Sequence, residues 1–441
     1  MQRSPSASRH RSDHRRTVSA ALFAAACALT AAVGPAQAQR PAAPRDPSPL
    51  PRLDEGVVIG TTRYGSGDLP PDVDPVTQRL DEAVAAGLRG FTVYADWPAL
   101  EPAPGDYAFD TLLAELDRLH ARGLKTFVNI TVGDIGEYVV PEAYADGSGG
   151  LAPGVRLDDP ALLARFRDLL AALAPALADR GVFALGVGNE IDDRLDGEHA
   201  DEREPYARFV RAANDHLDAI APGLATGVTL TATARRAGSE TLAAMRSAGD
   251  FVAVNYAPIA PDFFVLEPAA IASDFSAVLA TFGPGPIVIQ ELTCPSAASM
   301  GASDAWQATC FEILFDVVLA DPRVRFASVF SLEDFAEPVC AEIRAAFPPL
   351  DDVPEDFERR FLDYLCALGV LDGQGRPKPA WSVLLEAAGD AVPGRLERLR
   401  GRASPPESRA ELLRPAPGPA PAPPRFSRAR ARCCGDPSCL P

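Results

Sequence analysis

The sequence predicts a (β/α)8 barrel, a closed ring of eight parallel strands surrounded by helices. Short apolar segments alternate with segments of helical periodicity from about Glu55 to Asp390, and we count eight of each. The strand segments are continuous apolar runs, as expected for strands that are buried on both faces. An open doubly wound sheet would usually carry a glycine-rich phosphate loop after its first strand. The segment from Gly60 to Gly67 lacks that spacing, so we favour the barrel.

The elements follow one another regularly along the chain. The predicted strands lie at 56–62, 90–96, 125–132, 183–189, 224–232, 251–257, 286–291 and 326–332. The predicted helices lie at 76–87, 110–122, 161–179, 202–220, 239–248, 269–281, 303–320 and 379–388. Residues 333–378 form a long insertion with a further helical piece at 355–368, which we expect to lie over the barrel mouth.

The two ends of the chain differ from this pattern. Residues 1–38 resemble a secretory signal peptide, because an arginine-rich start and an apolar stretch lead to Ala36-Gln37-Ala38. Residues 39–54 form a Pro-rich linker, 55–390 the barrel domain, and 391–441 a Pro/Arg-rich tail that we expect to be disordered. We therefore expect export to the periplasm or the extracellular space. A twin-arginine signal, a membrane anchor and a lipoprotein anchor through Cys27 are the alternatives.

Charge and cysteine content exclude several functions. The net charge is −18, and arginines are concentrated at the two ends, so the barrel itself is strongly acidic. Such a surface does not favour nucleic acid, and no later segment is long and apolar enough to span a membrane. Four cysteines with undetermined pairing lie in the barrel domain, and none of the four has metal-ligand spacing: Cys294, Cys310, Cys340 and Cys366. The tail holds a further cluster, with a zinc or redox role as the alternative to none: Cys433, Cys434 and Cys439. We expect no metal or organic cofactor. We also expect a monomer.

Polar residues gather where the predicted strands end, which is where barrels of this kind place their chemistry. Glu190 and Glu291 each close an apolar strand. A carboxylate in that place is costly to desolvate unless it is paired or used. Two of them suggest an acid/base and a nucleophile acting on a glycosidic bond. The other candidates are polar or aromatic residues suited to a sugar: Arg63, Tyr94, Trp97, Asn129, Asn189, Tyr256, Phe330 and Glu333.

These positions resemble glycoside hydrolase clan A, the retaining barrel glycosidases. Asn189-Glu190 closes the fourth strand and Glu291 the seventh. The segment from Trp97 to Asp110, with its Glu-Pro pair and its Gly-x-Tyr-x-Phe pattern, resembles the loop after the clan's second strand. The resemblance covers nearly all of residues 55–390.

The resemblance implies a double displacement on an oligo- or polysaccharide, with β-linkages as the clan's tendency. Glu190 would be the general acid/base and Glu291 the nucleophile. Asn189 would bind the sugar 2-hydroxyl, Tyr256 would orient the nucleophile, and Arg63 would help to keep Glu291 ionised.

Two interpretations stay open for the other candidates. For Tyr94, Trp97 and Asn129 they are contact with the sugar and packing at the barrel top. For Glu333 they are binding of sugar hydroxyls and solvation of the long insertion. Many clan members place a tryptophan at the end of strand eight, where this sequence has Phe330. Phe330 would take the place of this tryptophan as a platform for the sugar, or Trp306 or Trp381 would do so from a loop. A carbohydrate-binding barrel without catalysis and a transglycosylase with the same residues are the alternative functions.

Overall fold

The computed structural model describes residues 50, 53, 56–63, 75–197, 199–346 and 355–392. The predicted signal peptide with Cys27, most of the predicted linker, and the tail from residue 393 with Cys433, Cys434 and Cys439 lie outside these residues.

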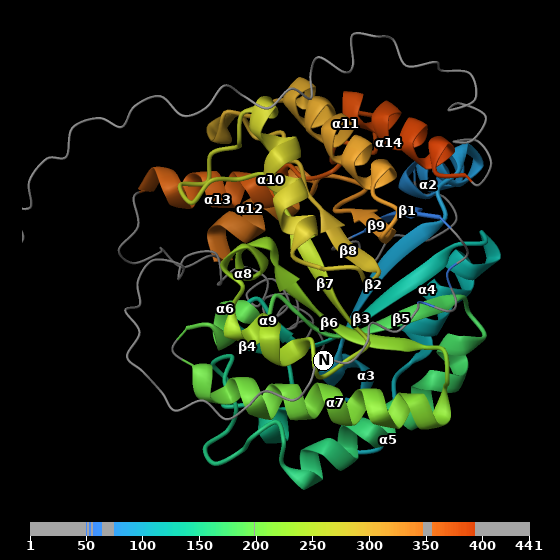
Figure 1. Ribbon diagram of the computed structural model, residues 1–441, viewed down its shortest axis with the longest axis vertical. Coiled ribbons are helices and arrows are strands. Elements are labelled where there is room, and N and C mark those ends of the chain that lie inside the picture. The colour runs from blue at the N-terminus through green and yellow to red at the C-terminus, as the bar shows by residue number, and fades with distance from the viewer. Residues whose placement is uncertain are drawn as a thin grey trace, which may run out of the picture. The chain divides into compact units, whose positions relative to one another are not determined.

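Eight parallel strands close into a barrel, as predicted (Figure 1). They are β1 (Val58–Thr62), β2 (Gly90–Asp96), β3 (Lys125–Asp134), β5 (Val182–Asn189), β6 (Ala225–Thr231), β7 (Phe251–Tyr256), β8 (Ile287–Leu292) and β9 (Val324–Val329). Neighbouring strands follow chain order, and β9 pairs with β1 to close the ring. A two-residue strand, β4 (Glu137–Tyr138), extends β3 in the antiparallel direction.

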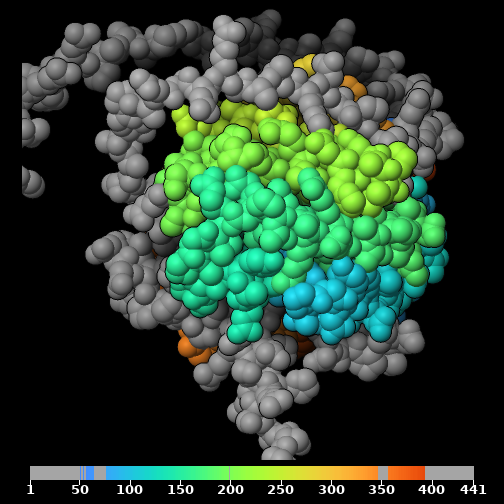
Figure 2. Space-filling model, turned by 90° about the horizontal axis from the view of Figure 1, so that it is seen from below, coloured from blue at the N-terminus to red at the C-terminus, as the bar shows by residue number. Residues whose placement is uncertain are grey.

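The eight predicted helices lie outside the ring. They are α2 (Pro75–Ala86), α4 (Asp110–Ala121), α5 (Pro160–Ala178), α7 (Arg203–Ile220), α9 (Glu240–Met245), α10 (Pro268–Ala280), α11 (Asp304–Ala320) and α14 (Pro379–Asp390). Side chains of α5 and α7 form much of the green surface in Figure 2. Pro160 opens α5, where its missing N–H costs nothing.

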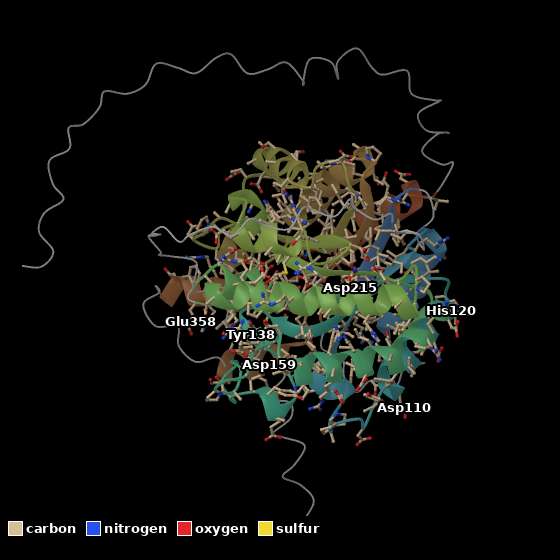
Figure 3. The ribbon with its side chains drawn as sticks, turned by 60° about the horizontal axis from the view of Figure 1, so that its bottom comes forward. Asp110, His120, Tyr138, Asp159, Asp215 and Glu358 are labelled. Atoms are coloured by element: carbon tan, nitrogen blue, oxygen red, sulfur yellow. A yellow bond between two sulfur atoms is a disulfide. The ribbon has the colours of Figure 1, made fainter. Side chains whose placement is uncertain are left out.

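Short helices that the periodicity did not predict follow the carboxyl ends of strands. They are α3 (Trp97–Leu100), α6 (Asp192–Leu195), α8 (Ala232–Ala237) and α12 (Glu337–Ala346). The predicted piece in the long insertion is α13 (Glu355–Cys366). In Figure 3, Glu358 of α13 and Tyr138 of β4 lie toward the same end of the molecule, and His120 at the end of α4 lies toward the opposite end.

Phenylalanine side chains fill the lower barrel interior. Phe127, Phe183 and Phe326 are fully buried, and the Phe183 and Phe326 rings lie 4.9 Å apart. Leu50 and Leu53 pack against this cluster. A closed barrel of eight strands leaves only enough room for side chains, so this layer makes a solid floor beneath the mouth.

Two disulfides settle the pairing of the barrel cysteines. Cys294 bonds with Cys310 of α11, and Cys340 of α12 bonds with Cys366 of α13. Among the described residues, none of the helices has both the length and the apolar character needed to cross a bilayer.

Candidate active site

Glu190 follows β5 in a left-handed backbone conformation with φ of +49°. Such a conformation costs a residue other than glycine roughly 1–3 kcal/mol and is enriched at functional sites. The strand before it is also specialised. A Cβ on Gly188 would lie 2.0 Å from the Tyr206 hydroxyl, which donates to the Val187 carbonyl at 2.9 Å. The close fit explains the glycine before Asn189-Glu190.

Glu291 lies beside an irregularity in β8. Val254 pairs with Ile289, but Asn255 pairs with Glu291, so Gln290 is an extra residue in this strand. Bulges of this kind re-aim side chains and are common beside active sites. Gln290 hydrogen-bonds Asn129 at 2.7 Å inside the barrel, while Glu291 accepts a hydrogen bond from the Tyr94 hydroxyl. The bulge therefore lets two consecutive side chains both point inward, Gln290 into the barrel interior and Glu291 into the mouth.

A network of amide side chains connects the two glutamates. The Asn255 amide nitrogen donates to Glu190 Oε1 at 2.9 Å and to Asn189 Oδ1 at 3.0 Å. Gln290 Nε2 donates to the same Asn189 oxygen at 2.7 Å and to Glu291 Oε1 at 3.5 Å. Both glutamates are half-buried and reach solvent at the mouth.

Burial and mutual charge raise the pKa of both carboxyl groups. Burial raises the pKa of Glu190 well above its usual value, and the charges of Glu291 and Asp193 raise it further. Burial also raises the pKa of Glu291 to about 7, against the hydrogen bonds from Tyr94 and Gln290 that lower it. The donors thus favour the ionised form of Glu291, and the charge of Glu291 favours the protonated form of Glu190, which is the division that nucleophile and acid need.

Asn189 hydrogen-bonds residues that neighbour the two glutamates. Its Oδ1 accepts from Asn255 at 3.0 Å and from Gln290 at 2.7 Å, and its Nδ2 donates to Asp134 Oδ1 at 3.0 Å. Burial raises the pKa of Asp134 to about 7, and the hydrogen bond from Asn189 opposes the rise. The charge of Asp134 in turn raises the pKa of Glu291, so Asp134 belongs to the site.

The prediction that Tyr256 orients the nucleophile is wrong. The Tyr256 hydroxyl donates to Asp274 of α10 at 2.8 Å, and its ring lies 4.4 Å from Phe275. Successive residues of a strand point to opposite faces. Because Asn255 faces the mouth, Tyr256 faces the helices, and Tyr94 supplies the hydrogen bond to Glu291 instead.

Trp97 and Asn129 are not at the mouth surface. Trp97 is fully buried, and its indole N–H donates to Glu101 at 2.9 Å. Glu101 also forms an ion pair with Arg165 at 3.0 Å, so this pair shapes the loop. Asn129 is fully buried and donates to the Gly188 carbonyl at 3.1 Å, beneath the site. Packing is thus the correct interpretation for both residues.

Arg63, Glu333 and Phe330 lie where β1 and β9 end. Arg63 Nε donates to Glu333 Oε1 at 2.7 Å in a mostly buried ion pair, whereas we expected Arg63 to act on Glu291. Phe330 is half-buried directly after β9, and its peptide bond to Ser331 is cis. Trp381 packs in the core between helices and barrel, so it is not a substitute platform.

Sequence reasoning did not single out Tyr364 of α13. Burial and the charges of Glu190 and Glu291 raise the pKa of its phenol. The helical periodicity of its segment predicts a helix but not that these charges act on it.

Comparisons with known proteins agree with this fold. No protein-family model and no curated protein matches the chain. A solved GH5_18 structure from Bifidobacterium longum subsp. longum superposes with a TM-score of 0.59 at 15% identity, covering 77% of this chain and 80% of that one. A GH5_18 variant from Streptomyces cattleya, in complex with Manβ1-4GlcNAc, gives 0.56 at 21% identity, covering 77% and 81%.

An exo-β-1,4-mannosidase from an Opitutaceae bacterium gives a TM-score of 0.54 at 18% identity, covering 80% of this chain and 62% of that one. These neighbours belong to clan A, so the predicted resemblance is confirmed at the level of the fold.

Proposed function

We propose that the protein is an exported retaining glycoside hydrolase that cleaves β-linked O-glycosidic bonds of an oligo- or polysaccharide. Glu190 is the general acid/base and Glu291 is the nucleophile. The observation that carries the proposal is the pair of half-buried carboxyl groups joined by the Asn255, Asn189 and Gln290 amides at the mouth of the barrel.

The first step forms a covalent intermediate. The ionised Glu291 attacks the anomeric carbon, and the bond from that carbon to the leaving oxygen breaks. Glu190 transfers its proton to that oxygen. The raised pKa of Glu190 suits this task, because the group still carries a proton when Glu291 is ionised.

The second step releases the sugar. Glu190, now ionised, takes a proton from water, the water oxygen bonds to the anomeric carbon, and Glu291 leaves as a carboxylate. A sugar hydroxyl in place of water would give transglycosylation with the same residues. One Nδ2 hydrogen of Asn189 is used by Asp134, which leaves the other for the sugar 2-hydroxyl.

β-Mannosides are the first substrates to test. One structural neighbour was solved with Manβ1-4GlcNAc and another is an exo-β-1,4-mannosidase. Their sequence identity to this chain is low, so a panel of aryl β-glycosides and β-linked polysaccharides should accompany the mannosides.

A mechanism-based label tests the proposal directly. A 2-deoxy-2-fluoro glycosyl fluoride of the sugar that the panel identifies should trap an ester on Glu291, which peptide mass spectrometry locates. Glu291→Gln should lose turnover and labelling while still folding. Inverted product, an ester on another residue, or normal turnover by Glu291→Gln would each reject the assignment. Sugar binding without any product from the panel would favour the non-catalytic barrel, and transfer to an added acceptor sugar would favour the transglycosylase.

A further inference from the structure

The loop that carries Glu190 is fastened to the next strand of the barrel by Asp192. Asp192 Oδ1 accepts from the Thr231 N–H at 2.9 Å, and its Oδ2 accepts from the Thr231 hydroxyl at 2.6 Å. Asp192 is 4% exposed, so water hardly competes for these bonds. Hydrogen bonds to a carboxylate are among the stronger ones in proteins. The two bonds therefore fix Asp192 against the end of β6.

Thr231 lies beside the residue that binds Glu190. In the ladder between β6 and β7, Thr231 pairs with Asn255. The Asn255 amide nitrogen donates to Glu190 Oε1 at 2.9 Å. A closed cycle of contacts results, because the chain joins Glu190 to Asp192 and Asp192 holds Thr231. The β-ladder then joins Thr231 to Asn255, which returns to Glu190.

The cycle supports a backbone conformation that is not stable by itself. Glu190 is left-handed, and residues other than glycine keep this conformation only where the surrounding structure holds it. The local turn is weak, since the Asp193 N–H donates to the Glu190 carbonyl at 3.3 Å. Asp192 is two residues from Glu190 in the chain, so its bonds to Thr231 limit the directions in which the Glu190 side chain can point.

We propose that Asp192 is a positioning residue of this site, whose two bonds to Thr231 hold the Glu190 carboxyl group within reach of the leaving oxygen. The proposal rests on the proposed glycosidase function and adds to it a residue that does not touch the sugar. Proton transfer needs hydrogen-bond distance, and a displacement of about 1 Å can cost on the order of a hundredfold in rate.

The leaving group of the substrate reveals whether Glu190 is displaced. A dinitrophenyl glycoside of the sugar that the panel identifies departs without a proton, whereas the matching phenyl glycoside needs the proton of Glu190. In Asp192→Ala, kcat/KM on the phenyl glycoside should fall about tenfold or more, and on the dinitrophenyl glycoside it should stay within about threefold of wild type. A smaller folded fraction lowers both values alike and leaves their ratio unchanged.

A matched control lies four residues further along the chain. Asp196 accepts from the Thr241 N–H at 3.3 Å and from the Thr241 hydroxyl at 2.6 Å, but Thr241 belongs to α9 and not to a barrel strand. Asp196→Ala should therefore keep the wild-type ratio of the two kcat/KM values. Thr231→Ala removes one of the two bonds from the other side, so it should change the ratio in the same direction as Asp192→Ala, by a smaller factor.

Charge is the other way in which Asp192 acts on Glu190. Its charge is among those that raise the pKa of Glu190, after burial, Glu291 and Asp193. Asp192→Asn separates charge from position, because asparagine can accept from the Thr231 N–H and donate to the Thr231 hydroxyl oxygen. This variant should return the ratio to within about threefold of wild type.

Three results would overturn the proposal. They are equal losses on both glycosides in Asp192→Ala and Thr231→Ala, unchanged kcat/KM in both variants, and a ratio in Asp192→Asn as altered as in Asp192→Ala. Failure of the proposed glycosidase function is distinguishable, because the wild-type chain would then cleave neither glycoside or carry no label on Glu291.

Discussion

The hydroxyl of Tyr94 on β2 donates a hydrogen bond to Glu291 Oε1 on β8. The two strands are not neighbours in the ring, so the bond crosses the barrel mouth. It binds the charged form of Glu291 and lowers the pKa of that carboxyl group, against the burial that raises it.

Tyr94→Phe should therefore reduce activity and change its pH dependence. Loss of a hydrogen bond to a charged group is worth about 1.5–3 kcal/mol, so kcat/KM should fall roughly tenfold to a hundredfold. Without the donor the pKa of Glu291 rises, and the acid limb of the kcat/KM profile should move to higher pH, because attack needs the ionised form. A lower kcat/KM with an unmoved acid limb would mean that Tyr94 acts on the sugar and not on Glu291.

Chemical rescue should separate the roles of the two glutamates. Glu190→Ala should lose roughly 10²–10⁴-fold in kcat on substrates that need a proton on the leaving group. Azide should restore turnover of an activated aryl β-glycoside and give the β-glycosyl azide, since it attacks the intermediate on Glu291. Glu291→Ala should give the α-glycosyl azide, because azide then replaces the nucleophile. NMR of the products distinguishes the anomers, and exchanged outcomes would reverse the assignment.

Asp134→Asn should stabilise the protein more at high pH than at low pH. The pKa of Asp134 is raised from 3.8 to about 7 in the folded state. The folded state thus binds the proton more tightly, and the stability from this group is lost as pH rises from about 4 through about 7. Asparagine does not titrate, so its advantage should grow between pH 5 and pH 8 by roughly 2–3 kcal/mol, which should appear as a Tm difference larger by several degrees at pH 8.

Thermal scans of wild type and variant at both pH values measure this difference. Asp316→Asn, on the exposed face of α11, is the control for a general effect of charge. An advantage of Asp134→Asn that shrinks as pH rises would contradict the raised pKa.

Glu101→Ala should destabilise the fold without removing the chemistry. Glu101 is 1% exposed and accepts from Trp97 and from the Gly105 backbone, besides pairing with Arg165. Removing one partner of a buried ion pair costs about 3–5 kcal/mol. Tm should drop by several degrees, while kcat well below Tm stays close to wild type. A large loss of kcat at normal Tm would place Glu101 in the site after all.

Much of the barrel could be predicted from local patterns. Each predicted strand overlaps an observed one, and ends differ by up to three residues, as at β9, which ends at Val329 where the prediction ended at residue 332. Apolar runs and three- and four-residue spacings record which face of a segment is buried, and this depends on near neighbours in the chain. Short helices such as α8 escaped prediction because they are too brief to show a period.

The prediction of the site was less complete for a physical reason. Strand-end position identified Glu190, Glu291 and Asn189, but it could not tell which of Asn255 and Tyr256 faces the mouth. A shift of one residue reverses the face, and the bulge at Gln290 is visible only in the pairing of β7 with β8.

The sequence by itself determined the order of strands and helices. It also determined which two acidic residues close the fourth and seventh barrel strands. Both follow from burial periodicity and strand ends, which are local properties. Tertiary structure decided that Tyr94 and not Tyr256 binds Glu291, and which cysteines are bonded. Those outcomes depend on ring closure and on the packing of distant segments, whose contacts produce no periodic pattern along the chain.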